Sequence, residues 1–163
     1  MRRAIGLIVA VSLAGCATAY KPKGFSGGFS ETQLSENVFR VRFNGNGYTS
    51  AERASDLALL RSAQLTKEKG FSFFVLADEQ QSFSHSAFTT PTNTTTTGQA
   101  SMTGNTVNGT FSSTSSGGQV VNIYKPRAAN VVVMYHERPA VAQLVYDAAF
   151  ICQSVGAKYK APC

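Results

Sequence analysis

VFRVRFNGNGYTSAERASDLALLRSAQLTKEKGFSFFVLA, residues 38–77, is the stretch that decides the fold. Apolar and polar side chains alternate over residues 38–43, which predicts a strand with one face in water. Turn-forming Asn and Gly residues follow at 44–47. Residues 51–65 repeat apolar side chains at helical spacing, and residues 71–77 are apolar on both parities. The stretch therefore predicts strand, helix and central strand, a βαβ unit with a right-handed crossover.

Both ends of this helix carry recognisable signals. Thr49 and Glu52 have the S/T-x-x-E spacing of a capping box, in which each side chain accepts from the backbone N–H of the other residue. We therefore expect the helix to start at Ser50. Gly70 follows two lysines and stands where a glycine commonly ends a helix.

Arg61 lies within the apolar stripe of the same helix. One interpretation is a contact for an anion or a partner. The other is structural, since the long stem can cover apolar surface while the guanidinium pairs with a strand carboxylate such as Asp78 or Glu79. We favour the structural pairing.

The second half of the chain predicts further strands and a second helix. Residues 119–124, which follow a polar tract, are predicted to be ordered. The Lys-Pro pair at 125–126 is predicted to interrupt this ordered segment. Residues 131–136 are β-branched and apolar on both parities, as in an interior strand. Pro139 opens a second amphipathic helix, which Gly156 ends.

These elements predict an α+β fold with two layers. Its order is β-α-β, a long polar insertion, then β-β-α, with both helices on one face of a small mixed sheet.

The insertion, at about residues 82–118, differs sharply in composition. Residues 80–124 contain no charged side chain and are dominated by Thr, Ser, Asn and Gly. Ordering the backbone costs about 1–2 kcal/mol per residue, and burial of so few large apolar side chains cannot offset this cost. We therefore expect most of residues 84–118 to be disordered. The tract is either a variable surface insertion, which we prefer, or a spacer or segment that orders on a partner.

The strand parities predict an uncovered sheet face. Each helix has one apolar stripe, so together they cover one face of a sheet whose central strands are apolar on both. The side chains left uncovered are Phe74, Leu76, Val132 and Met134, or else the alternate residues of the same strands, which point to the opposite face. Either Phe83, Phe88 and Phe111 cover this set, or it is an exposed surface for a partner.

The N-terminal residues have the pattern of an export signal. Two arginines precede a short apolar run at 4–13, and Leu13-Ala14-Gly15-Cys16 looks like a bacterial lipobox. A transmembrane helix would need about 20 apolar residues, and Lys21 and Lys23 follow too soon. We therefore expect a signal peptide at 1–15.

Cys16 would then be the lipidated first residue of the mature chain. An anchor of two or three acyl chains holds a protein on a membrane permanently. By resemblance to the sorting rule of Gram-negative envelopes, Ala17 after the cysteine implies the periplasmic face of the outer membrane. Residues 16–34 would form the anchor and a partly docked tether, ahead of the domain at 35–163. Lys21 and Lys23 either attract anionic lipid head groups or only solvate the tether.

Cys152 and Cys163 are the remaining cysteines. Disulfides persist outside the cytoplasm, so an even pair there favours a bridge. The alternative is a buried thiol at Cys152 and a mobile terminal thiol at Cys163.

Several function classes find little support. Of the 15 Lys and Arg, 13 follow the leader and stand against 9 acidic residues; they are scattered, so nucleic acid is not an expected partner. His85 and His136 come without metal-ligand spacing, and no nucleophile motif accompanies the serines. We expect neither a metal nor another cofactor, and no enzyme.

Residues 27–31, 36–41 and 51–65, together with the lipobox, resemble a family of short lipoproteins of alphaproteobacteria. The resemblance implies an anchored envelope domain and transfers no catalytic residue. We expect a non-catalytic component that binds or braces an envelope protein or the cell wall. The alternative is an envelope stress sensor or assembly accessory that acts through a protein partner.

Overall fold

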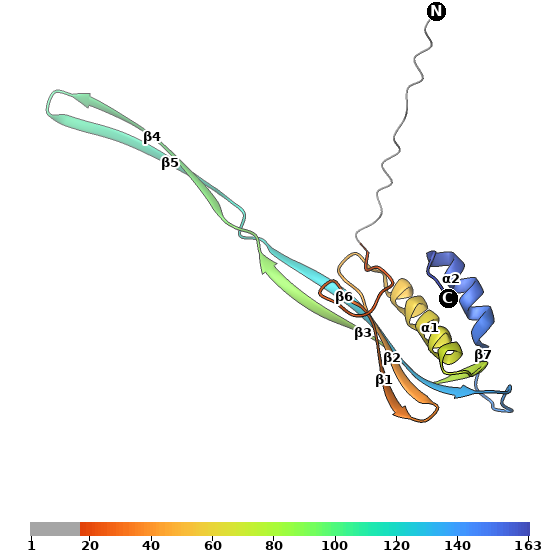
Figure 1. Ribbon diagram of the computed structural model, residues 1–163. Coiled ribbons are helices and arrows are strands. Elements are labelled where there is room, and N and C mark those ends of the chain that lie inside the picture. The colour runs from red at the N-terminus through yellow and green to blue at the C-terminus, as the bar shows by residue number, and fades with distance from the viewer. Residues whose placement is uncertain (1–16) are drawn as a thin grey trace, which may run out of the picture. The chain divides into compact units, whose positions relative to one another are not determined.

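The computed structural model describes residues 17–163, so the leader and Cys16 lie outside the described residues. The chain divides into two compact units. The helical unit runs up to Ser84 and resumes at Lys125, and the hairpin unit is His85–Tyr124. The elements, shown in Figure 1, are β1 Gly28–Ser35, β2 Val38–Asn44, α1 Ala51–Glu68, β3 Phe73–Thr89, β4 Asn93–Thr103, β5 Thr106–Ser116, β6 Val120–Tyr135, β7 Val145–Asp147 and α2 Ala148–Tyr159.

The fold is α+β, with two helices and a curled, mostly antiparallel sheet. The strand order in that sheet is β1-β2-β6-β3-β7, and β4 and β5 form a separate two-stranded sheet. The helix α1 connects β2 to β3 as predicted, but β6 lies between these two strands. The predicted neighbours are therefore separated by a strand from much later in the chain.

The first helix has a different cap from the one predicted. Ser50, not Thr49, is the N-cap residue, and its side chain accepts from the Arg53 N–H at 3.1 Å. Thr49 is buried and accepts from the backbone of Thr18 instead. The C-terminal signal was predicted correctly, because Gly70 adopts a φ of +82° immediately after the C-cap residue.

Both helices pack on one face of the sheet, side by side (Figure 1). Arg42 on β2 is exposed, whereas its alternate neighbours Val41 and Phe43 are fully buried, as the strand pattern predicted. The core beneath the helices has two clusters. The buried members are Phe39, Val41, Ala63, Leu65, Phe74, Val132, Met134, Ala148, Ile151 and Cys152 in one, and Phe43, Ala54, Leu57, Ala58, Leu60 and Ala128 in the other.

The second helix begins at Ala148, nine residues later than the predicted start at Pro139. Asp147 is its N-cap, and its carboxylate accepts from the N–H groups of Ala149 and Phe150 at 2.8 and 3.0 Å. The preceding residues Val145–Asp147 pair with β3. The predicted end was also wrong, because Gly156 is buried inside the helix.

Two further predictions about strands were wrong. Residues 125–126 do not interrupt β6, because Pro126 lies one residue beyond the last β2 pair and its carbonyl still accepts from Gly45 N–H at 2.8 Å. The predicted tether contains β1, which pairs with β2 from Gly28↔Asn44 onward. Its alternation is weak because the strand is at the sheet edge, and five of its eight residues are exposed.

The hairpin unit has strands where disorder was predicted. β4 and β5 pair in continuous antiparallel register from Asn93↔Ser116 to Thr103↔Thr106. Gly104, at φ +64°, occupies the first position of the two-residue turn, as a type II′ hairpin requires. Threonine favours strands. Pairing between the two strands satisfies backbone hydrogen-bonding groups although no side chain of either strand is buried.

Among residues 17–163, no helix is long and apolar enough to cross a membrane.

Candidate functional site

The first described residues are docked on the helical unit. Thr18 is 1 % exposed. Its N–H donates to Thr49 Oγ1 at 3.0 Å, its hydroxyl donates to the Ser26 carbonyl at 3.1 Å, and it accepts from the Asn46 N–H at 2.8 Å. The segment therefore becomes part of the fold two residues after Cys16.

A second set of contacts fastens this segment to α1. The Tyr20 ring packs against Phe29 with centroids 5.0 Å apart, and its hydroxyl donates to the Gln64 side chain. The Arg61 guanidinium lies 4.7 Å from the Phe29 ring centroid. Aromatic packing and a buried arginine thus hold residues 20–29 against the helix.

Arg61 has a structural pairing, as favoured, but with other partners. Its nitrogens lie 2.9 Å from Glu31 on β1 and 2.7 Å from Glu68 on α1, so the suggested partners Asp78 and Glu79 were wrong. Burial lowers the pKa of Arg61, but hydrogen bonds to Glu68 and Glu31 outweigh it and raise the pKa above its usual value. Arg61 is therefore a permanent cation, and its pairing with Glu31 and Glu68 joins β1 to α1.

Burial also raises the pKa of the Tyr20 phenol well above its usual value. Tyr20 therefore stays a neutral donor to Gln64 over the physiological pH range. Neither Tyr20 nor Arg61 changes charge near pH 7, which fits a structural fastening better than acid–base chemistry.

Thr18→Val should lower the free energy of unfolding by about 1–3 kcal/mol, because it keeps the shape of the side chain and removes a buried hydroxyl with two backbone partners. Chemical denaturation of the unlipidated mature chain measures this. Thr32→Val on β1 is the matched control, since Thr32 is exposed. Equal stability of the two variants would show that residue 18 is not docked.

Cys152 and Cys163, the predicted cysteine pair, are joined by a disulfide with a Cα–Cα distance of 5.4 Å. The bridge holds the C-terminal tail against α1, where the Gln64 side-chain amide donates to the Pro162 carbonyl. The Ala161 N–H also donates to the Gly156 carbonyl at 3.0 Å. Cys152 is buried, whereas Cys163 is exposed.

The predicted partner surface is not a surface. Phe74, Val132 and Met134 are fully buried beneath the helices, and Leu76 packs against the same cluster. Phe39 on β2 pairs with Val132 on β6, so the two side chains point to the same face of the sheet. The helices cover that face. The predicted cover, Phe83, Phe88 and Phe111, is also wrong, since all three rings are exposed.

The hairpin unit presents two different faces. Threonine and serine hydroxyls bond across the strands on one of them, at 2.9 Å for Thr94 with Ser115 and 2.8 Å for Thr96 with Ser113. Further along this face, Phe111 lies over Gly98, where a Cβ would clash with the ring. The larger apolar side chains on this face, Met102, Val107 and Phe111, are all exposed.

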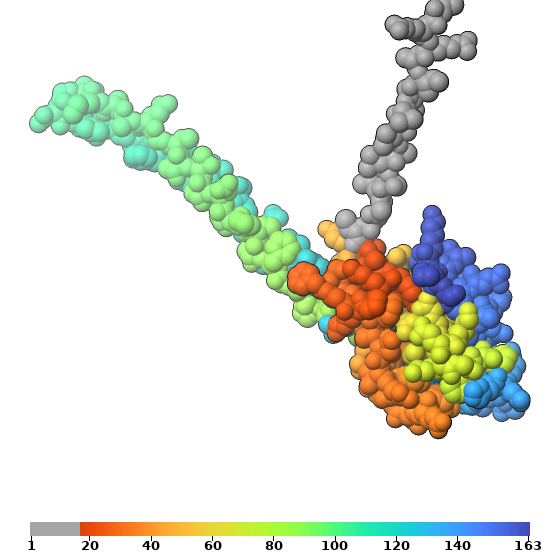
Figure 2. Space-filling view, in the orientation of Figure 1, coloured from red at the N-terminus to blue at the C-terminus, as the bar shows by residue number. Residues whose placement is uncertain are grey.

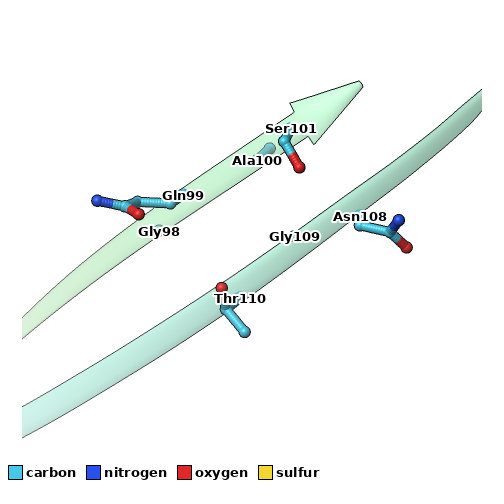
Figure 3. Close-up of a pocket in the computed structure, with 7 residues that line it drawn as sticks. All are labelled: Gly98, Gln99, Ala100, Ser101, Asn108, Gly109 and Thr110. Atoms are coloured by element: carbon cyan, nitrogen blue, oxygen red, sulfur yellow. The ribbon is translucent and has the colours of Figure 1, made fainter. Parts of the chain in front are cut away.

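The other face carries only hydroxyl and amide groups. A hollow on the ribbon is lined by residues of both strands, including Gln99, Ser101, Asn108 and Thr110 (Figure 3). Gly109 and Ala100, which also line it, form a cross-strand pair with almost no side chain. None of the lining residues titrates, so the hollow can exchange hydrogen bonds but cannot move protons.

The strand edges of this ribbon lack charged side chains. A two-stranded sheet leaves one edge of each strand unpaired, and natural proteins usually protect such edges with charges. Residues 85–124 contain no Asp, Glu, Lys or Arg. Both edges therefore remain open for pairing with an added strand.

Replacing residues 91–117 by Asn-Gly should shift the melting temperature by only a few degrees, because no side chain of β4 or β5 is buried. The Gly118 N–H already donates to the Thr90 carbonyl at 3.1 Å, so a two-residue turn can close there. Differential scanning calorimetry measures the shift. A decrease of more than about 3 kcal/mol in the free energy of unfolding would show that the ribbon stabilises the core.

Within residues 17–163, no group of three or more His, Cys, Asp and Glu side chains could hold a metal ion. His136 stacks on Phe71 with ring centroids 4.3 Å apart, and His85 lies 6.4 Å from the Tyr124 ring. The sequence predicted a partly docked tether over residues 16–34 but did not single out Thr18. Its only signal was a small polar residue in a Gly- and Ser-containing segment.

No family model, curated protein or solved structure matches this chain.

Proposed function

We propose that this chain is a lipoprotein of the bacterial cell envelope, anchored through Cys16 to the periplasmic face of the outer membrane. Its folded part is a non-catalytic component that binds or braces another envelope component. The observation that carries the proposal is the position of Thr18. Among the described residues, Thr18 is the first with a buried side chain, so a lipid on Cys16 would lie two residues from it.

The hairpin unit is the part we assign to partner binding. It combines unpaired strand edges, exposed apolar side chains and a face of hydroxyl and amide groups. An extended segment of an envelope protein can add to such an edge through main-chain hydrogen bonds. Glycan hydroxyls of the cell wall can exchange hydrogen bonds with the polar face.

Cys16→Ser tests the anchor. We expect the wild-type protein to incorporate radioactive palmitate and to sediment with membranes, and the variant to lose both properties. Cys163→Ser is the matched control, because it removes a cysteine that the proposal does not lipidate. Equal labelling of Cys16→Ser and the wild type would contradict the anchor.

Complementation tests the binding role. A strain that lacks the gene should have a more permeable envelope, and wild-type protein should restore the barrier. The variant with residues 91–117 replaced by Asn-Gly should be anchored and folded and yet fail to restore it. Full restoration by this variant would contradict a binding role for the hairpin unit.

An envelope stress sensor is the second candidate, and the exposed end of the Cys152–Cys163 disulfide favours it. Exposed disulfides are the ones most readily exchanged with thiols. Loss of a sensor should change transcription of a stress regulon, whereas loss of a brace should change only permeability. Transcript profiling of the deletion strain separates the two.

A further inference from the structure

The surface around Thr18 has the composition of a membrane-facing surface, and the inference drawn from it rests on the proposed lipid anchor. Two consecutive peptide units span at most about 7 Å. The acyl chains on Cys16 would therefore hold Thr18, with its hydrogen bonds to Ser26, Asn46 and Thr49, at the level of the lipid head groups. A chain with a long flexible tether would have no preferred orientation, but this one has almost no slack.

Phe25 projects from this surface on a turn that two backbone hydrogen bonds close. Gly24 and Gly27 exchange backbone hydrogen bonds of 2.9 and 3.2 Å across it. The carbonyl of the next residue, Ser26, accepts from the Thr18 hydroxyl. The Phe25 side chain is nonetheless fully exposed, at 112 % of the reference value, the highest among the exposed large apolar side chains. An apolar ring held in water beside the anchor point is suited to insertion at a bilayer interface.

Tyr48 is the second exposed ring beside Thr18. It precedes Thr49, which accepts from the Thr18 N–H, and its own N–H donates to the Asn46 side chain at 3.0 Å. Its side chain is 76 % exposed. Tyrosine is enriched where membranes meet water, because its ring is apolar and its hydroxyl can reach the head groups.

The charges on this surface favour an anionic bilayer. Lys21 and Lys23 are exposed and directly precede the Phe25 turn. Two acidic residues at the start of α1, Glu52 and Asp56, are both bound by Lys158, at 2.8 and 2.7 Å. Figure 2 shows the orange-red residues of this segment on the outside of the helical unit.

We propose that Lys21, Lys23, Phe25 and Tyr48 form a surface that lies on the bilayer to which Cys16 is attached. The bilayer fixes the orientation of the helical unit, with the first turn of α1, next to Thr49, towards the membrane. The lipid anchor supplies attachment, and this surface supplies orientation.

The chain contains no tryptophan, so Phe25→Trp introduces a single reporter at the proposed surface. The lipidated mature protein is placed in vesicles of phosphatidylethanolamine and phosphatidylglycerol with brominated acyl chains. Emission from Phe25→Trp should shift to shorter wavelength and be quenched by the bromine. Phe150→Trp is the matched control. Phe150 is 65 % exposed, at the opposite end of α2 from Lys158, and its tryptophan should show neither effect.

Tyr48→Trp is a second reporter that keeps the test decisive if Phe25→Trp does not fold. Floating vesicles whose tryptophans at both positions emit as in water, without quenching, would overturn the membrane surface and leave the anchor intact. A wavelength shift without bromine quenching would indicate a second copy of the chain on this surface, which also overturns it. Failure of the wild-type protein to float with the vesicles would overturn the anchor itself and this inference with it.

Discussion

Replacing Phe74 by alanine is expected to lower the free energy of unfolding of the unlipidated mature chain by about 3–5 kcal/mol. The ring is fully buried and stacks on Tyr146 with centroids 5.1 Å apart. It packs in the cluster that joins the sheet to both helices, including Val132 and Met134. Alanine would leave a cavity there that the neighbouring rigid elements can only partly fill.

Phe83→Ala is the matched control in the same strand. Phe83 is 60 % exposed, so its truncation should change stability by less than about 0.5 kcal/mol. Urea denaturation followed by circular dichroism measures both variants. A loss below about 1 kcal/mol for Phe74→Ala would contradict the packing described for β3 and would return Phe74 to the exposed partner surface that the sequence suggested.

Cys163→Ser should cost about 3 kcal/mol, because the disulfide closes a loop of roughly a dozen residues and restricts the unfolded chain. The sequence separation of the two cysteines is 11. Cys163 is the better position to change because it is exposed, whereas serine at buried Cys152 would add an unpaired hydroxyl to the core.

A reducing agent provides the control for the disulfide prediction. Dithiothreitol should lower the stability of the wild type to that of Cys163→Ser and leave the variant unchanged. If reduction destabilises both proteins equally, or neither, the stabilisation does not come from the Cys152–Cys163 bond.

The first half of the fold was the more predictable half, because its signals are local. Alternation over β2 and helical periodicity over α1 report directly which side chains face a core. Gly70 gave the end of α1 because its positive φ suits glycine. Within α1 only the cap was misplaced, since Ser50 and Thr49 carry the same capping hydroxyl and differ only through the contact of Thr49 with Thr18.

Later elements were harder because their boundaries depend on long-range contacts. Residues 139–147 continue the apolar periodicity of α2, but Val145 and Tyr146 pair with β3 and prevent the helix from starting earlier. Which face of the sheet the helices cover also depends on contacts between residues far apart in the sequence. Phe74 and Val75 are both buried and apolar, so strand composition alone could not separate the covered parity from the other.

The hairpin unit was missed because disorder was inferred from the lack of a core. β4 and β5 have no buried side chain, as the composition indicated. Their pairing instead depends on backbone hydrogen bonds, on threonine propensity and on a turn at Gly104.

The candidate sites also differed in how far the sequence could predict them. The cysteine pair could be selected by counting, whereas the docking of Thr18 depends on Ser26, Asn46 and Thr49.

Mass spectrometry of the N-terminal peptide from the membrane-bound protein tests the central claim most directly. The account predicts that residues 1–15 are absent and that Cys16 is the first residue, carrying a diacylglyceryl group with or without a further N-acyl chain. An N-terminal peptide that retains the leader, or that begins at an unmodified Cys16, would contradict it.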